Sequence, residues 1–276
     1  MIKICSIALL FTLLFASCGG GEAQKRFDEA QALYDNKQFQ AAKSAIDSIN
    51  ILFPREIEIR KKALTLMRLA ERGESVQNIA FCDSVYPICI EEFENLKKGF
   101  IFEKDSAYDK IGNYIWSTMT IERNVERCYI RCGVNEEGEM YMASVYFGGH
   151  PIEHTGLKLS TKDGTFAETP AIPYDGGLNY RFKDLGSTTE VVTYKGDNCK
   201  SIANFVSVID EKERIKADYT GGKPYSIYLS DSDKKAIKAT YQLASVLSDI
   251  DALQREKAKS EKKIMLIDEK LKGKTK

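Results

Sequence analysis

The sequence predicts an α+β fold with a helical N-terminal region, a central antiparallel β-sandwich-like domain and a long C-terminal helix that packs back on the N-terminal helices. Three observations support this prediction. Apolar residues recur at helical spacing before residue 110. Short segments rich in Tyr, Val, Ile and Thr alternate with turns over 111–230. Within 231–272, apolar residues form a stripe along one side of a predicted helix. The 276 residues are 43% apolar and 29% charged, which is typical of a globular protein with a sizeable core.

The first element is an apolar segment that we interpret as a signal peptide over 1–17. Lys3 supplies a positive charge, and the stretch from Ile4 to Phe15 is apolar. This stretch is shorter than the ~20 residues that a membrane-spanning helix requires. The small residues Ala16 and Ser17 follow it, as at a cleavage site. The segment therefore predicts export of the chain.

The end of this segment, Phe15-Ala16-Ser17-Cys18, resembles the lipobox of bacterial lipoproteins, with Phe15 where that family usually has leucine. The signal and much of the chain resemble envelope lipoproteins of the Bacteroidetes group. This resemblance implies that Cys18 becomes the first residue of the mature chain, carries lipid such as palmitate, and attaches the protein to a membrane of the cell envelope. An ordinary secretory peptide cut near Ala16 is the alternative.

The same resemblance bears on location and on the linker after the anchor. Surface-exported members tend to carry several acidic residues after the cysteine, whereas here only Glu22 follows. The resemblance therefore favours the outer membrane facing the periplasm, with surface exposure as the alternative. Glycine runs behave as random coil, so Gly19, Gly20 and Gly21 predict that residues 18–24 form a flexible tether.

Residues 25–110 are expected to be helical. The segment Phe27–Pro54 resembles one tetratricopeptide hairpin, with small residues at Ala30 and Ala42, where the helices touch. The pattern does not recur, and repeat arrays need about three units for stability. We therefore expect a single hairpin, extended by further helices to about Lys98, and the resemblance implies a protein-interaction role.

The region 111–230 is expected to be an antiparallel β-domain with one short helix. Turn residues at Asn135–Gly138, Lys162–Gly164 and Thr220–Lys223 separate the strands, and helical spacing returns over Ile202–Ile209. The expected strands are Tyr114–Ile121, Val125–Val134, Glu139–Phe147, Thr155–Ser160, Leu178–Phe182, Thr189–Tyr194, Arg214–Tyr219 and Tyr225–Leu229.

The last element is a coiled-coil-like helix over 231–272. Asp231 and Asp233 suit its N-terminus, where the helix dipole favours negative charge. An apolar seam with alternating spacings of three and four residues runs along it and is interrupted at Lys257 and Ser260. We expect the seam from Leu243 onwards to pack on the N-terminal helices, with a second copy of the chain as the alternative partner.

Seven cysteines are present, of which Cys5 lies in the signal and Cys18 is the expected lipid site. An odd number remains, which excludes a complete disulfide framework within one chain. We expect most of the others to be small buried apolar residues. They are Cys82, Cys89, Cys128, Cys132 and Cys199.

The strongest motif with metal-binding chemistry is the pair Cys128 and Cys132 followed by His150 and His154. Four such side chains would suit zinc. A strand would hold the two cysteines ~13 Å apart, which is too far for bonds to one ion. We therefore expect no metal and no cofactor here, and the histidines to lie in a loop.

Neither a catalytic nor a nucleic-acid-binding role is indicated. The sequence contains no Gly-x-Ser-x-Gly, no His-Glu-x-x-His and no glycine-rich phosphate loop, so we expect no catalytic residues. Its 40 basic and 40 acidic residues cancel, which gives no electrostatic footprint for nucleic acid.

The preferred hypothesis is thus a non-catalytic, lipid-anchored envelope protein that acts as a protein-interaction or scaffold module. The alternative is a glycan- or peptide-binding lipoprotein that uses aromatic residues of the β-domain, and the third is an envelope enzyme of unknown reaction. An exposed aromatic row on one sheet face would favour the binding module. The candidate residues are Tyr114, Trp116, Tyr141, Tyr146, Phe147, Tyr174, Tyr180 and Tyr194.

Overall fold

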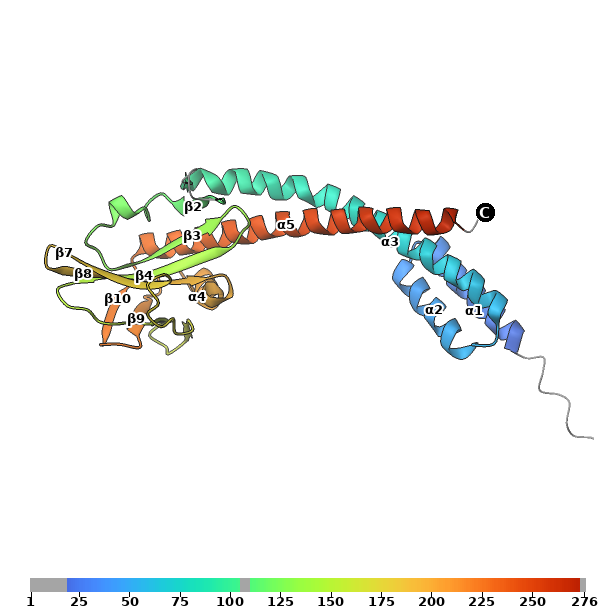
Figure 1. Cartoon of the computed structure of the whole chain (residues 1–276), viewed down its shortest axis with the longest axis horizontal. Coiled ribbons are helices and arrows are strands. Elements are labelled where there is room, and N and C mark those ends of the chain that lie inside the picture. The colour runs from blue at the N-terminus through green and yellow to red at the C-terminus, as the bar shows by residue number, and fades with distance from the viewer. Residues whose placement is uncertain (1–18, 105–109, 274–276) are drawn as a thin grey trace, which may run out of the picture. The chain divides into compact units, whose positions relative to one another are not determined.

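The computed structural model describes residues 19–104 and 110–273 (Figure 1). The chain divides into two compact units. The helical unit contains the N-terminal residues up to Ser84 together with the C-terminal residues from Arg255, and the β-unit contains Val85–Gln254. Among the described residues, no helix is long and apolar enough to span a membrane.

The helical unit begins with a hairpin of α1 (Gly19–Asp35) and α2 (Phe39–Leu52). The N-terminal part of α3 (Ile57–Leu96) packs on it. The core of this unit is small, and its alanines let the helix axes approach closely. It contains Ala30, Ile46, Ile49, Ala63 and Leu66.

Residues 18–24 were expected to form a flexible tether. In the structure, α1 begins at Gly19, so residues 19–24 are helical. Ala23 is fully buried, so packing of the first turns outweighs the poor helix propensity of the three glycines. Cys18 itself lies outside the described residues.

The C-terminal part of α5 (Asp231–Lys272) packs against α3 within the helical unit. Arg72 of α3 pairs with Asp268 of α5 at 2.8 Å, and Asp83 accepts from Lys257 at 2.6 Å. Ile267 of α5 is buried in the same unit. The prediction that the C-terminal helix packs back on the N-terminal helices is therefore confirmed.

The β-unit contains two antiparallel sheets. The six-stranded sheet has the order β1 (Phe100–Glu103), β2 (Asn113–Trp116), β3 (Tyr129–Asn135), β4 (Met140–Gly148), β8 (Ser187–Lys195) and β7 (Asn179–Asp184). The four-stranded sheet has the order β10 (Tyr225–Tyr228), β9 (Lys216–Thr220), β5 (Gly156–Ser160) and β6 (Phe166–Glu168). The α+β architecture with an antiparallel β-domain is thus the predicted one.

One apolar core joins the two sheets, α4 (Asp197–Val208) and the first half of α5. Leu243 and Leu247 of α5 belong to this core, together with Val192 of β8 and Leu157 of β5. The first half of the α5 seam therefore packs in the β-unit, and the C-terminal part packs in the helical unit. The sequence pattern had predicted that the whole seam from Leu243 onwards packs on the N-terminal helices.

Two predicted strands are shorter than expected, because residues 117–128 leave the sheet. The side-chain amide of Asn124 donates to the carbonyls of Thr118 and Thr120 at 2.9 and 2.8 Å. These bonds close the segment into a local turn, with a 3-10 helix at Ile121–Arg123. β3 consequently begins at Tyr129.

Candidate binding sites of the beta-unit

The two faces of the six-stranded sheet differ in what they contact. Along β3 and β4, Ile130, Cys132, Met142 and Ser144 point into the core and are fully buried. The alternate residues point to the opposite face, because side chains of a strand alternate between faces. On that face the structure has a groove rather than a second layer.

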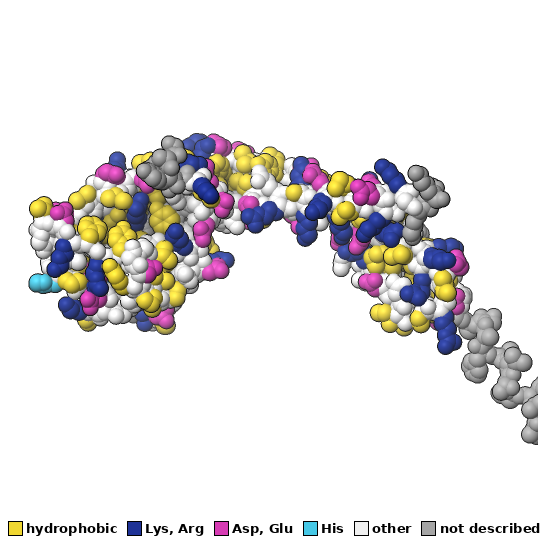
Figure 2. Space-filling model, in the orientation of Figure 1, with side chains coloured by type: hydrophobic (Ala, Val, Ile, Leu, Met, Phe, Trp, Pro, Cys, Tyr) yellow, Lys and Arg dark blue, Asp and Glu magenta, His cyan; other side chains and the backbone are white. Residues whose placement is uncertain are grey.

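This groove, which we call the sheet groove, has a volume of about 430 Å³. Its floor is formed by β3, β4 and β8, one wall by residues 121–127, and the other wall by the β7–β8 hairpin. Five aromatic rings line it: Tyr129, Tyr141, Phe147, Tyr180 and Phe182. Hydrophobic side chains gather on this hollowed face of the β-unit in Figure 2.

Strand register aligns these rings across the sheet. Phe147 and Phe182 both lie opposite Thr189 on β8, one on each side of it. Tyr180 and Phe182 stack on the edge strand with ring centroids 6.4 Å apart and planes inclined by 14°. Phe182 is 51% exposed and Tyr180 is 37% exposed, so both rings are accessible to a ligand.

The walls of the sheet groove add aliphatic surface. Ile121 and Val125 on one wall are more than half exposed, and Leu185 at the tip of the β7–β8 hairpin is 99% exposed. Isolated exposed apolar residues are ordinary, but a contiguous set around a groove marks an interaction site.

Two arginines line the groove next to the aromatic floor. Arg127 pairs with the buried carboxylate of Asp233 at 3.2 Å, and Arg131 pairs with Glu103 at 3.3 Å. The Nε–H of Arg131 is buried and has no hydrogen-bond partner among the described residues. Burial raises the pKa of Tyr141 to about 12, so its hydroxyl stays protonated at neutral pH. The groove therefore has arginine–carboxylate pairs and a neutral tyrosine hydroxyl beside its apolar floor.

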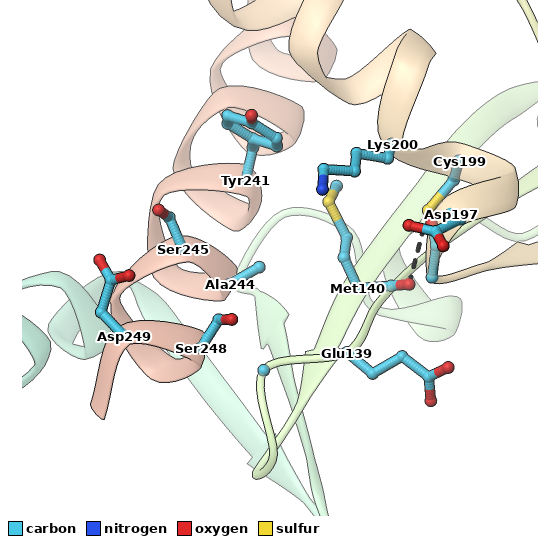
Figure 3. Close-up of a pocket in the computed structure, with 12 residues that line it drawn as sticks. Glu139, Met140, Asp197, Cys199, Lys200, Tyr241, Ala244, Ser245, Ser248 and Asp249 are labelled. Atoms are coloured by element: carbon cyan, nitrogen blue, oxygen red, sulfur yellow. Dashed lines mark hydrogen bonds between the residues drawn. The ribbon is translucent and has the colours of Figure 1, made fainter. Parts of the chain in front are cut away.

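A second, smaller pocket of about 250 Å³ lies between the β3–β4 turn, the start of α4 and the middle of α5 (Figure 3). Glu139, Asp197, Lys200 and Asp249 surround it, and Lys200 extends toward its centre. Cys199 also lines this pocket, and its thiol donates to the Met140 carbonyl at 3.4 Å. Burial raises the pKa of Cys199 to about 12, which makes it a poor nucleophile.

A buried polar cluster joins the two sheets and has the spacing of a Ser–His–acid triad. Ser144 Oγ lies 2.8 Å from His154 Nε2, and His154 Nδ1 lies 2.9 Å from a carboxylate oxygen of Glu190. All three residues are at most 2% exposed, so no substrate reaches Ser144 in this structure. Glu190 also accepts from the backbone N–H of Glu153 at 2.9 Å, which fixes the loop before β5. The cluster satisfies buried polar groups.

The four residues weighed as zinc ligands lie in separate environments. Cys128 Sγ accepts from the Tyr225 hydroxyl at 3.1 Å, and Cys132 contacts Thr240 of α5. His154 belongs to the buried cluster, and His150 is exposed. Within residues 19–104 and 110–273, no three His, Cys, Asp or Glu side chains are placed to hold a metal ion.

The described cysteines all carry free thiols. Burial raises the pKa of Cys132 to about 12, and desolvation also raises the pKa of Cys89. Cys82, Cys132 and Cys199 are buried, as expected for cysteines that act as small apolar residues.

The structure divides the aromatic residues singled out in the sequence. Tyr141, Phe147 and Tyr180 line the sheet groove. The others lie elsewhere: Tyr146 and Tyr194 are buried in the core, Tyr114 and Trp116 pack on it, and Tyr174 is exposed. Tyr129 and Phe182 were not among the aromatic residues predicted from the sequence, although Phe182 lies two residues after Tyr180 and thus on the same face of β7.

Comparison with protein-family models and with curated protein sequences gives no match for this chain.

Proposed function

We propose that this protein is a non-catalytic, lipid-anchored protein of the cell envelope whose β-unit binds an apolar peptide segment of a partner protein in the sheet groove. The observation that carries the proposal is the row of five rings on one face of the six-stranded sheet, with two of them substantially exposed on the edge strand β7. The membrane attachment rests on the lipobox-like sequence ending at Cys18.

Two features favour a peptide over a glycan. The exposed wall residues Ile121, Val125 and Leu185 are aliphatic, and sugar hydroxyls gain nothing from them. Both arginines of the groove already hold carboxylates, so few free polar groups remain for hydroxyl recognition. A peptide with apolar side chains at alternate positions would place them on the aromatic floor.

The test is a screen of the chain from Gly19 to Lys276 against arrayed peptides from envelope proteins and against arrayed glycans. We expect binding to apolar peptides, and we expect Phe182→Ser to weaken it about tenfold or more, because the loss of an aromatic contact worth ~1.4 kcal/mol already lowers affinity tenfold. Phe166→Ser is the matched control. Phe166 is also an edge-strand phenylalanine, 53% exposed, but belongs to the other sheet.

The outcomes separate the hypotheses. Peptide binding that Phe182→Ser and Phe166→Ser weaken equally would contradict the groove as the site. Binding to glycans alone, lost in Phe182→Ser, would favour the glycan-binding alternative.

A further inference from the structure

Three large apolar side chains are exposed where α2 ends and α3 begins. Ile51 is 77% exposed, Leu52 58% and Ile57 61%. They surround a short turn in which Phe53 N donates to Ile49 O and Glu56 N donates to Phe53 O. We call these three residues the apolar tip. The small core of the helical unit leaves them uncovered.

The apolar tip lies at the end of the helical unit where the chain enters it. α1 and α2 form an antiparallel hairpin, so the last turn of α2 lies beside the first turn of α1 (Figure 1). A methyl group placed on Gly20 would lie 3.6 Å from the Glu56 carboxylate, which fixes this proximity. Cys18, the expected lipid site, directly precedes Gly19 in the sequence.

The charge around the apolar tip suits a phospholipid surface. Residues 51–62 contain Arg55, Arg60, Lys61 and Lys62 against Glu56 and Glu58, an excess of two positive charges in a chain whose net charge is zero. Lys61 pairs with Glu58 at 2.8 Å, while Arg60 donates to the Pro54 carbonyl. Basic residues near an anionic membrane each contribute about 1 kcal/mol to binding.

The size of the apolar tip argues against a protein partner. A stable protein–protein interface uses about 20–30 residues on each side, and the tip offers three apolar side chains. Insertion of a few Ile and Leu side chains into the boundary between headgroups and acyl chains needs no such area.

We propose that the apolar tip inserts into the headgroup region of a phospholipid bilayer and orients the helical unit on the membrane. The inference rests on the proposed function in one respect, the lipid at Cys18, which would hold the tip at high effective concentration near the bilayer. A second contact beside the anchor would restrict rotation of the helical unit about its lipid.

The first test uses the chain from Gly19 to Lys276, which has no lipid, and sedimentation with vesicles of phosphatidylcholine containing about 30% phosphatidylglycerol. We expect measurable binding at millimolar lipid, and we expect Ile51→Ser/Leu52→Ser to lower the partition coefficient about tenfold. The control, Val76→Ser/Phe81→Ser, replaces two exposed apolar residues of α3 in the same unit and should bind like the unaltered chain. Circular dichroism checks that both variants are folded.

The second test asks whether the tip enters the bilayer. Tryptophan is placed at the tip by Leu52→Trp and, separately, away from it by Phe81→Trp, and vesicles with brominated acyl chains are added. We expect fluorescence quenching for Leu52→Trp and not for Phe81→Trp. Equal quenching of the two, or equal sedimentation of the two double variants, would overturn the inference.

Two further outcomes would also overturn it. One is absence of vesicle binding by the unaltered chain. The other is a dimer that Ile51→Ser/Leu52→Ser dissociates, since a second copy would then cover the tip. Peptide binding in the sheet groove, measured on the same samples, should be unaffected by the tip variants, so failure of this inference is distinguishable from failure of the proposed function.

Discussion

At the residue scale, Gly138 in the β3–β4 turn is required by both its backbone conformation and its surroundings. Its φ is +83°, and a Cβ there would lie 2.7 Å from the backbone nitrogen of Ser248 on α5. Gly164 in the β5–β6 turn has a similar φ of +90° but open space around it. A substitution at Gly164 therefore tests backbone strain alone, whereas one at Gly138 tests strain together with a steric clash.

We predict that Gly164→Ala lowers the free energy of unfolding of the β-unit by ~1–2 kcal/mol, the cost of a left-handed alanine. Gly138→Ala should lower it by a further ~1–3 kcal/mol, because the backbone of α5 must move. Urea unfolding of both variants measures the difference. Equal losses would show that the turn does not rest on α5.

His154 gives the fold a dependence on pH. Complete burial lowers the pKa of His154, and this effect outweighs the opposing one of Glu190. The unfolded chain binds a proton near the ordinary pKa of about 6.5, whereas the folded chain does so only at lower pH. Protonation therefore favours unfolding, and stability is lost as pH falls below about 6.5.

We predict that the free energy of unfolding falls between pH 7.5 and pH 5.5, and that His154→Gln reduces this slope because the titrating group is gone. The check is urea unfolding at both pH values. His150→Gln, at an exposed position, should retain the slope of the unaltered chain. A slope in His154→Gln as steep as in the unaltered chain would mean that other groups cause it.

At the scale of elements, α5 has buried apolar residues in both units. Leu243 is fully buried in the core of the β-unit, and Ile267 is 5% exposed in the helical unit. We predict that Leu243→Ala and Ile267→Ala each lower the free energy of unfolding of their own unit by ~2–5 kcal/mol, because each leaves a cavity at a buried position. Amide hydrogen exchange should show faster opening of the β-unit in the first variant and of the helical unit in the second.

Exposed neighbours on the same helix provide the controls for this pair. Gln242→Ala and Met265→Ala should change hydrogen exchange little. If Leu243→Ala instead opened the helical unit, the division of the α5 seam between the two units would be wrong.

Elements in which the apolar pattern repeats many times could be predicted from the sequence, whereas the sheet groove could not. The C-terminal helix matches its predicted range because its apolar seam repeats over many turns. β1 and β6 have four and three residues, too few for an alternating pattern to show. The sheet groove depends on cross-strand register and on residues 121–127 leaving the sheet, and neither is encoded in the spacing of any one segment.

At the scale of the whole molecule, membrane attachment is expected to depend on one residue. We predict that Cys18→Ala abolishes metabolic labelling with a palmitate analogue and blocks processing of the signal, because no other group replaces the thiol that carries the lipid. Cys5→Ala removes the neighbouring cysteine of the expected signal peptide and should leave labelling intact. Labelling that survives Cys18→Ala would contradict the anchor.

The composition of the helical unit has a consequence for the order in which the chain becomes structured. Its α1–α2 hairpin is synthesised first, but its α5 portion begins at Arg255, after the whole β-unit has been made. The β-unit can fold as soon as its own residues have emerged, since domains generally fold as units during synthesis. The N-terminal helices must therefore wait for their last partner, and the α3 surface around Arg72 stays uncovered until Asp268 has been made. In that interval the unfinished chain exposes a helix surface that the finished protein hides.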